Sequence, residues 1–108
     1  MDVNNTKFEE KIEESIKNKE YDKSFKALVA LIQTVNIKIV SNKLNKKLVT
    51  NNFYEIMEIY RKNNFELYEI LKGINYIYEN YSKIKKVDLE EIIELKELYY
   101  KLKNFLNT

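Results

Sequence analysis

The chain has 108 residues and a formal net charge of +2; it contains no His, Cys, Trp or Pro, and its only glycine is Gly73. Without imidazole and thiol groups it lacks side chains that commonly serve proton transfer, nucleophilic attack and soft-metal binding. A single glycine also excludes a glycine-rich phosphate loop. We therefore expect no catalytic residue, no cofactor and no metal site.

A composition of 44% hydrophobic and 33% charged residues is typical of a globular protein, and we expect one helical domain over residues 1–108. The longest apolar run, Ala27–Ile32, is far shorter than the roughly 18 residues of a membrane span, so no membrane partner is expected. The first residues lack the basic start and apolar centre of a signal peptide, which favours a cytoplasmic location. The net charge by itself is too small to indicate a nucleic-acid partner.

The first predicted helix spans about residues 6–19. Thr6 and Glu9 have the spacing of a capping box, which marks a helix start. Apolar residues follow at four-residue steps: Phe8, Ile12 and Ile16. The second predicted helix, about residues 21–44, has the widest apolar face and is expected to be the most buried. That face comprises Phe25, Leu28, Val29, Leu31, Ile32, Val35, Ile39 and Val40.

Between residues 45 and 52 the apolar period gives way to Asn, Lys and Thr, which predicts a loop. Asn51 or Asn52 can cap a short helix that follows. Its apolar face holds Phe53, Ile56, Met57 and Tyr60. The pair Asn63 and Asn64 is expected to interrupt the chain before the next helix.

The next predicted helix carries apolar residues from Leu67 to Tyr81. Gly73 lies inside it at a cost of about 1 kcal/mol relative to Ala, which predicts close packing against a neighbouring helix. A short basic linker, residues 82–87, leads to a last helix that Asp88 and Glu91 are expected to cap. Together these elements predict an all-α fold, an antiparallel up-and-down bundle of four to five helices.

The segment from Ile16 to Leu28, sequence IKNKEYDKSFKAL, resembles the first helix-to-helix turn of the HEPN superfamily. The long second helix, the short helix from Phe53, and residues 78–82 before an amphipathic last helix follow the same order of elements. The resemblance covers roughly residues 8–106. It implies a small helical bundle that is often dimeric.

Active HEPN ribonucleases carry an Arg followed four to six residues later by a His. The only arginine here is Arg61, and Phe65, Glu66 and Leu67 occupy the positions of that His. The resemblance therefore implies a member without the ribonuclease motif, like the non-catalytic members that act as substrate-binding or partner subunits.

The most asymmetric charge distribution is an acid-free stretch from Lys23 to Tyr54. Its lysines at the end of the second helix form a candidate anion or nucleic-acid site: Lys38, Lys43, Lys46 and Lys47. One interpretation is phosphate binding, with asparagine side chains as further donors. The other is that lysines gather there because the C-terminal end of a helix carries a negative dipole.

The nine tyrosines have two interpretations as well. Aromatic rings beside lysines can stack on unpaired bases. Tyr68, Tyr78 and Tyr81, however, lie in apolar register, which favours the edge of the core with hydroxyls in water. Tyr76 and Tyr100 lie off the apolar faces and are expected to be exposed.

Because catalytic residue types are missing and the second and last helices have broad apolar faces, the sequence favours a non-enzymatic, HEPN-like interaction module. We expect its partner to be a second copy of the chain or another helical protein. The alternative is an RNA- or nucleotide-binding protein that uses the lysines at the end of the second helix.

Overall fold

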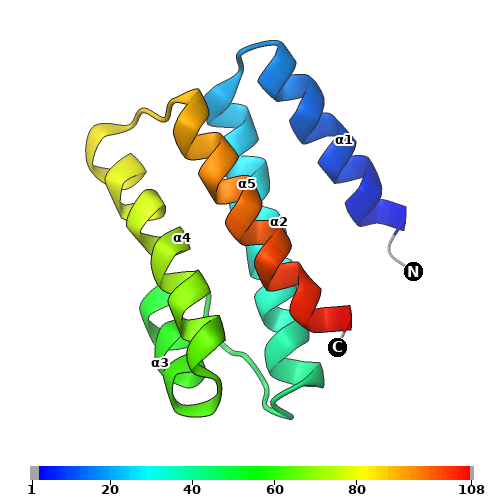
Figure 1. Cartoon of the computed structure of the whole chain (residues 1–108), viewed down its shortest axis with the longest axis vertical. Coiled ribbons are helices and arrows are strands. Elements are labelled where there is room, and N and C mark those ends of the chain that lie inside the picture. The colour runs from blue at the N-terminus through cyan, green and yellow to red at the C-terminus, as the bar shows by residue number, and fades with distance from the viewer. Residues whose placement is uncertain (1–2, 108) are drawn as a thin grey trace.

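The computed structural model describes residues 3–107, and within this range the chain is all-helical with no strand. Figure 1 shows an antiparallel up-and-down bundle, as the sequence predicts. Its elements are α1 (Val3–Lys17), α2 (Tyr21–Asn42), α3 (Phe53–Asn63), α4 (Phe65–Ile84), α5 (Leu89–Asn104) and a short 3-10 turn, η1 (Phe105–Asn107).

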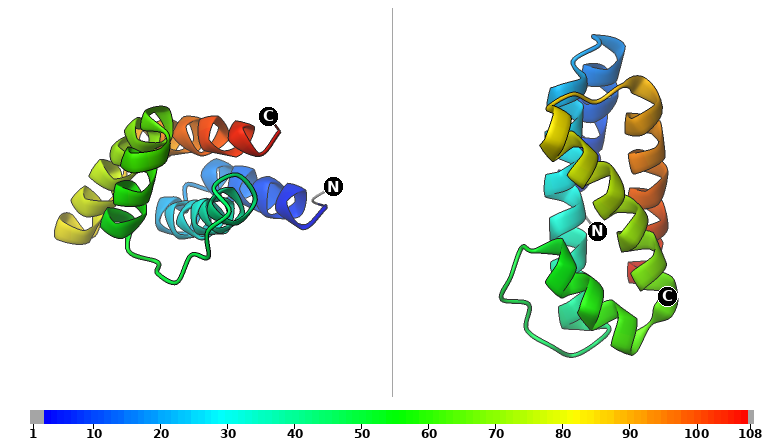
Figure 2. Two further views of the ribbon diagram at one scale, coloured as in Figure 1. Left: turned by 90° about the horizontal axis from the view of Figure 1, so that it is seen from below. Right: turned by 90° about the vertical axis from the view of Figure 1, so that its left-hand side faces the viewer.

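The helices pack in the order α1, α2, α5, α4, α3, so α2 lies between α1 and α5, while α4 lies between α5 and α3. The chain runs up α1, down α2, up α4 and down α5 (Figure 1). The long connection after α2 brings the chain back to start α3, which forms a hairpin with α4 (Figure 2). The described part measures 39 × 34 × 21 Å.

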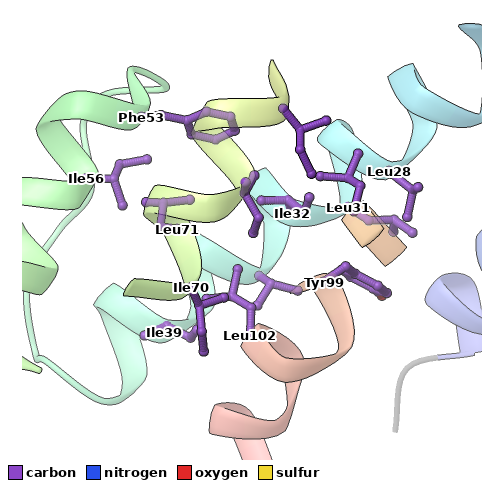
Figure 3. Close-up of a cluster of buried hydrophobic side chains, with 14 of the residues drawn as sticks. Leu28, Leu31, Ile32, Ile39, Phe53, Ile56, Ile70, Leu71, Tyr99 and Leu102 are labelled. Carbon is purple, nitrogen blue, oxygen red and sulfur yellow. The ribbon is translucent and has the colours of Figure 1, made fainter. Parts of the chain in front are cut away.

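One hydrophobic core joins all five helices. Figure 3 shows side chains of α2, α3, α4 and α5 meeting in it, among them Ile32, Leu71 and Leu102. By length and composition α2 would also pass as a membrane span, but half of its most apolar window is buried in the bundle. The predicted role of this helix as the most buried one is confirmed.

Asparagine and aspartate side chains cap the starts of α3, α4 and α5, as predicted. Asn52 Oδ1 accepts hydrogen bonds from the backbone N–H groups of Tyr54 and Glu55, at 2.8 and 3.3 Å. Asn64 caps α4 in the same way. Asp88 accepts from the backbone N–H of Glu91 at 2.9 Å, and the Glu91 side chain accepts from the backbone N–H of Asp88, which completes the capping box.

Four predicted boundaries differ from the structure. The first helix ends at Lys17, two residues earlier than predicted. The first helix already begins at Val3, so Thr6 lies within it and is not its N-cap. The second helix ends at Asn42, two residues early, and α4 continues to Ile84, where a linker was predicted. Phe8 is also not part of the buried face: it is 51% exposed, because α1 packs on α2 through Ile12 and Ile16.

Gly73 has the close neighbour that its position inside a helix predicts. A Cβ at residue 73 would lie 3.2 Å from Leu98 Cδ1 and 3.6 Å from Leu98 Cδ2. Leu98 belongs to α5, so the missing side chain lets α4 and α5 approach closely.

Candidate functional site

The predicted lysine site lies at the end of α2 and in the connection to α3. Lys38 is half-buried on α2, Lys43 is the C-cap directly after the last residue of this helix, and Lys43, Lys46 and Lys47 are exposed. The backbone N–H of Lys46 donates to Val40 O at 3.0 Å, which ties the connection to the end of α2. The four lysines thus belong to one end of the bundle, where the C-terminal dipole of α2 is negative.

The only arginine takes part in a local surface contact. Arg61 Nε and Nη2 donate to the two carboxylate oxygens of Glu58, at 2.9 and 2.8 Å, one turn earlier on α3. The hydrogen bond from Arg61 lowers the pKa of the Glu58 carboxyl. Both side chains are about half exposed, so we assign this pair little stabilising effect. Within residues 3–107 no group of three or more acidic side chains is placed to hold a metal ion.

A more elaborate arrangement of polar side chains lies between α3 and α4. Two adjoining hollows there share Tyr54, Asn75 and Glu79. The larger has a volume of about 390 Å³, and the smaller, about 210 Å³, reaches toward α2. We call the two together the α3–α4 groove. Its further lining residues are Gln33, Asn51, Asn52, Phe53, Met57, Lys72, Tyr76, Tyr78, Asn80 and Lys83.

Glu79 is the centre of the hydrogen bonds in this groove. Asn75, one turn earlier on α4 and only 6% exposed, donates from Nδ2 to Glu79 Oε1 at 2.9 Å. The Tyr54 hydroxyl donates to the same oxygen from the first turn of α3. The two donors hold the carboxylate in one orientation and link the start of α3 to the middle of α4.

Gln33 forms the side of the smaller hollow that belongs to α2. Its Nε2 donates to the backbone carbonyl of Asn51 at 2.8 Å, which anchors the end of the long connection. Because a carbonyl can only accept, this hydrogen bond fixes which end of the amide is the nitrogen. Gln33 Oε1 is then a buried acceptor without a hydrogen-bond partner among the described residues.

Aromatic rings surround these polar groups. Tyr78 packs edge-on against Phe53, with ring centroids 5.2 Å apart, and parallel to Phe25 at 6.3 Å. Tyr54 is 57% exposed and Tyr76 is 77% exposed. The groove therefore combines a fixed carboxylate, amide groups and several accessible aromatic faces.

A second buried polar contact lies between α2 and α3. The Tyr60 hydroxyl donates to Asn36 Oδ1 at 2.7 Å, and both residues are 0% exposed. Burial raises the pKa of Tyr60 well above its ordinary value, because an ionised phenolate would be desolvated there. Asn36 Nδ2 has no hydrogen-bond partner in the described part of the chain.

The predictions for individual tyrosines are largely confirmed. Tyr76 and Tyr100 are exposed, and Tyr68 and Tyr81 lie half-buried at the edge of the core. Tyr78 is 39% exposed, more than expected, although its ring packs on Phe25.

The sequence interpretation did not single out Gln33, Asn75 or Glu79. One signal was present: Asn75 is a polar residue directly beside Ile74 on the apolar face of its helix. Such a position calls for a specific hydrogen-bond partner.

Comparisons with known proteins give no match to this chain, whether against protein-family models, curated proteins or solved structures.

Proposed function

We propose that this protein is a non-catalytic interaction module that binds a protein partner through the α3–α4 groove. The observation that carries the proposal is the cluster of accessible tyrosines, Tyr54, Tyr76 and Tyr78, around the fixed polar pair of Asn75 and Glu79. Tyrosine is enriched at protein interfaces because it supplies a large contact area and a hydroxyl at a low cost in side-chain entropy.

Residue chemistry supports binding rather than turnover. The chain has no imidazole or thiol, and the described lining of the groove contains one carboxylate, Glu79. The carboxylate accepts from two neutral donors, Asn75 and Tyr54, which hold it in one orientation, and the described lining supplies no second carboxylate.

The HEPN-like resemblance is part of the same proposal. The chain lacks His, and its only arginine is held by Glu58 on the surface of α3, as suits a member without ribonuclease activity. On this proposal the partner is a second copy of the chain or another helical protein.

Site-specific photo-crosslinking in the native cells tests the proposal. A photoreactive phenylalanine analogue at position 76 should give a discrete crosslinked protein product. The same analogue at Tyr100, which is also an exposed tyrosine but lies on α5 outside the groove, is the matched control and should not. With the identified partner purified, Tyr76→Ala should weaken binding about tenfold or more, the effect of a typical hot spot.

The result that contradicts the proposal is equal crosslinking from both positions, or none from position 76. Unchanged affinity of Tyr76→Ala for the purified partner contradicts it as well.

A second candidate function, binding of RNA or a nucleotide at the lysines of the α2 end, has the exposure of Lys46 and Lys47 in its favour. The salt dependence of RNA binding, and the loss of that binding in Lys46→Glu with Lys47→Glu, test it.

A further inference from the structure

The smaller hollow of the α3–α4 groove has an excess of hydrogen-bond acceptors. Three of its polar side chains are at least partly buried: Gln33, Asn75 and Glu79. The two amide nitrogens already donate within the protein, Gln33 Nε2 to Asn51 O and Asn75 Nδ2 to Glu79 Oε1. Gln33 Oε1 is buried without a hydrogen-bond donor among the described residues, the hydrogen bond of Asn75 to Glu79 uses its Nδ2 and not its Oδ1, and Glu79 is a carboxylate. A ligand that only donates hydrogen bonds fits this set.

Charge points to the same kind of ligand. The ion pairs between described side chains join Arg61 to Glu58, Lys96 to Glu13 and Lys103 to Glu9, and none of them involves Glu79. Glu79 is half-buried, and its hydrogen-bond donors, Tyr54 and Asn75, are neutral. A partly buried carboxylate gains most from a cationic partner with its own N–H groups.

The volume and the lining residues of the smaller hollow indicate which cationic ligand it can hold. About 210 Å³ is less than the roughly 300 to 1,000 Å³ of sites for cofactors and other small molecules, so the space suits one side chain. The rings of Phe53, Tyr54 and Tyr78 line it, and aromatic faces attract cations at close range. Guanidinium is planar, stacks on such rings and has five donors and no acceptor, whereas ammonium is a strongly hydrated point charge.

We propose that the smaller hollow receives an arginine side chain from a segment of the protein partner, an inference that rests on the proposed function. The guanidinium donates to Glu79, Asn75 Oδ1 and Gln33 Oε1 and stacks on the surrounding rings. Lys72 and Lys83 line the larger hollow beside it. They complement an acidic residue next to the arginine, so the recognised segment carries an arginine flanked by acidic residues.

Titration with short peptides tests the ligand without the unknown partner. The probe is a capped Glu-Arg-Glu tripeptide, and the control peptide has citrulline, a neutral isostere, in place of arginine. The expected result is weak binding of the arginine peptide that shifts the NMR signals of the Asn75 and Gln33 side-chain amides. The citrulline peptide should bind at least about tenfold more weakly, since it lacks the charge that Glu79 complements.

Variants of the protein supply the matched comparison. Glu79→Gln should weaken binding of the arginine peptide about tenfold or more, whereas Glu94→Gln, an exposed carboxylate on α5, should leave it unchanged. Gln33→Met removes the unpartnered acceptor together with the hydrogen bond to Asn51 O, and it should weaken binding severalfold. This variant serves if Glu79→Gln fails to fold, and thermal unfolding of both variants shows whether they fold.

Equal affinity for the arginine and citrulline peptides overturns the inference, and so does binding of guanosine monophosphate to the same amides in preference to the arginine peptide. A partner that crosslinks from position 76 but binds Glu79→Gln as tightly as the unaltered protein sinks this inference and leaves the proposed function standing. If the arginine peptide binds specifically but no partner crosslinks from position 76, the proposed function fails and the assignment of the smaller hollow to an arginine side chain stands.

Discussion

Asn36, a polar residue on the apolar face of α2, fixes how α2 and α3 are aligned. Asn36 lies among Ile32, Val35 and Ile39 on the most buried helix, and its Oδ1 accepts the Tyr60 hydroxyl from α3. A buried amide costs free energy unless its hydrogen bonds are made, so this contact aligns α2 and α3 in one register rather than adding much net stability.

We predict that Tyr60→Phe lowers the free energy of unfolding by about 1–3 kcal/mol, because it leaves Asn36 Oδ1 buried without a donor. Adding Asn36→Leu, which is similar in shape and removes both unpaired polar atoms, should restore about 1 kcal/mol or more. Urea denaturation measures both effects. Tyr76→Phe, at an exposed tyrosine, is the control and should change stability by less than about 0.5 kcal/mol. A double variant no more stable than Tyr60→Phe would contradict the argument.

Asn75 and Glu79 show which residues of the α3–α4 groove could be recognised from the sequence and which could not. The position of Asn75 on an apolar face is visible in the sequence and signals a buried hydrogen bond. Its partner Glu79 lies four residues on, an ordinary helical spacing, and gives no signal of its own. Gln33 precedes Asn75 by 42 residues in the sequence. Only the path of the chain from α2 to α3 brings these residues together, so the sequence alone could not show the groove.

At the scale of elements, the helices differ in the kind of contact that holds them in the bundle. Helix α1 packs on α2 through Ile12 and Ile16, and charged groups link it to α5. Glu9 accepts from the Tyr99 hydroxyl and from Lys103 Nζ, each at 2.7 Å, and Glu13 pairs with Lys96. Such partly exposed ion pairs are screened by salt, whereas the apolar contacts of α2 with α5 are not.

The close contact between α4 and α5 at Gly73 leads to a prediction about stability. Although a side chain at residue 73 meets Leu98, we expect the smallest one to raise the free energy of unfolding. Gly73→Ala should stabilise the protein by roughly 0.5 kcal/mol, because the gain of about 1 kcal/mol in helix propensity exceeds the cost of moving a Leu98 methyl by a few tenths of an ångström. Thermal or urea unfolding measures the change. The control is Gly73→Val, whose larger side chain should destabilise by about 1–3 kcal/mol. Destabilisation by Gly73→Ala would show that Leu98 cannot move.

At the scale of the whole molecule, most of the fold follows from periodicity and caps. The five helices and their Asn52, Asn64 and Asp88 starts are predictable because these signals are local. The width of the α2 face also suggested an apolar surface left for a partner. The structure instead covers Leu28, Leu31 and Ile39 inside the molecule, because α1 and α5 both pack on this helix. Which helices share a core is a long-range property, and the sequence pattern does not encode it locally.

The uneven distribution of charge over the molecule leads to the last prediction. Residues 23–54 contain lysines and no acidic residue, whereas the net charge of the chain is only +2. The lysines at the α2 end, of which Lys43, Lys46 and Lys47 are exposed, then support only weak attraction for RNA. We expect a dissociation constant of about 100 µM or weaker at physiological salt and a salt slope of about −3 or shallower, since single strands release roughly 0.7 counterion per phosphate contact.

Fluorescence anisotropy with a single-stranded RNA across a salt series measures this binding. Lys46→Glu with Lys47→Glu should abolish it, while the charge-matched control, Lys17→Glu at the end of α1 with Lys19→Glu in the exposed turn after it, should reduce it only slightly. The arginine peptide should bind both double variants like the unaltered protein, because these lysines do not line the α3–α4 groove. Submicromolar RNA affinity that the Lys46 and Lys47 changes destroy would instead identify RNA as the ligand, since a few surface lysines alone cannot supply that affinity at physiological salt.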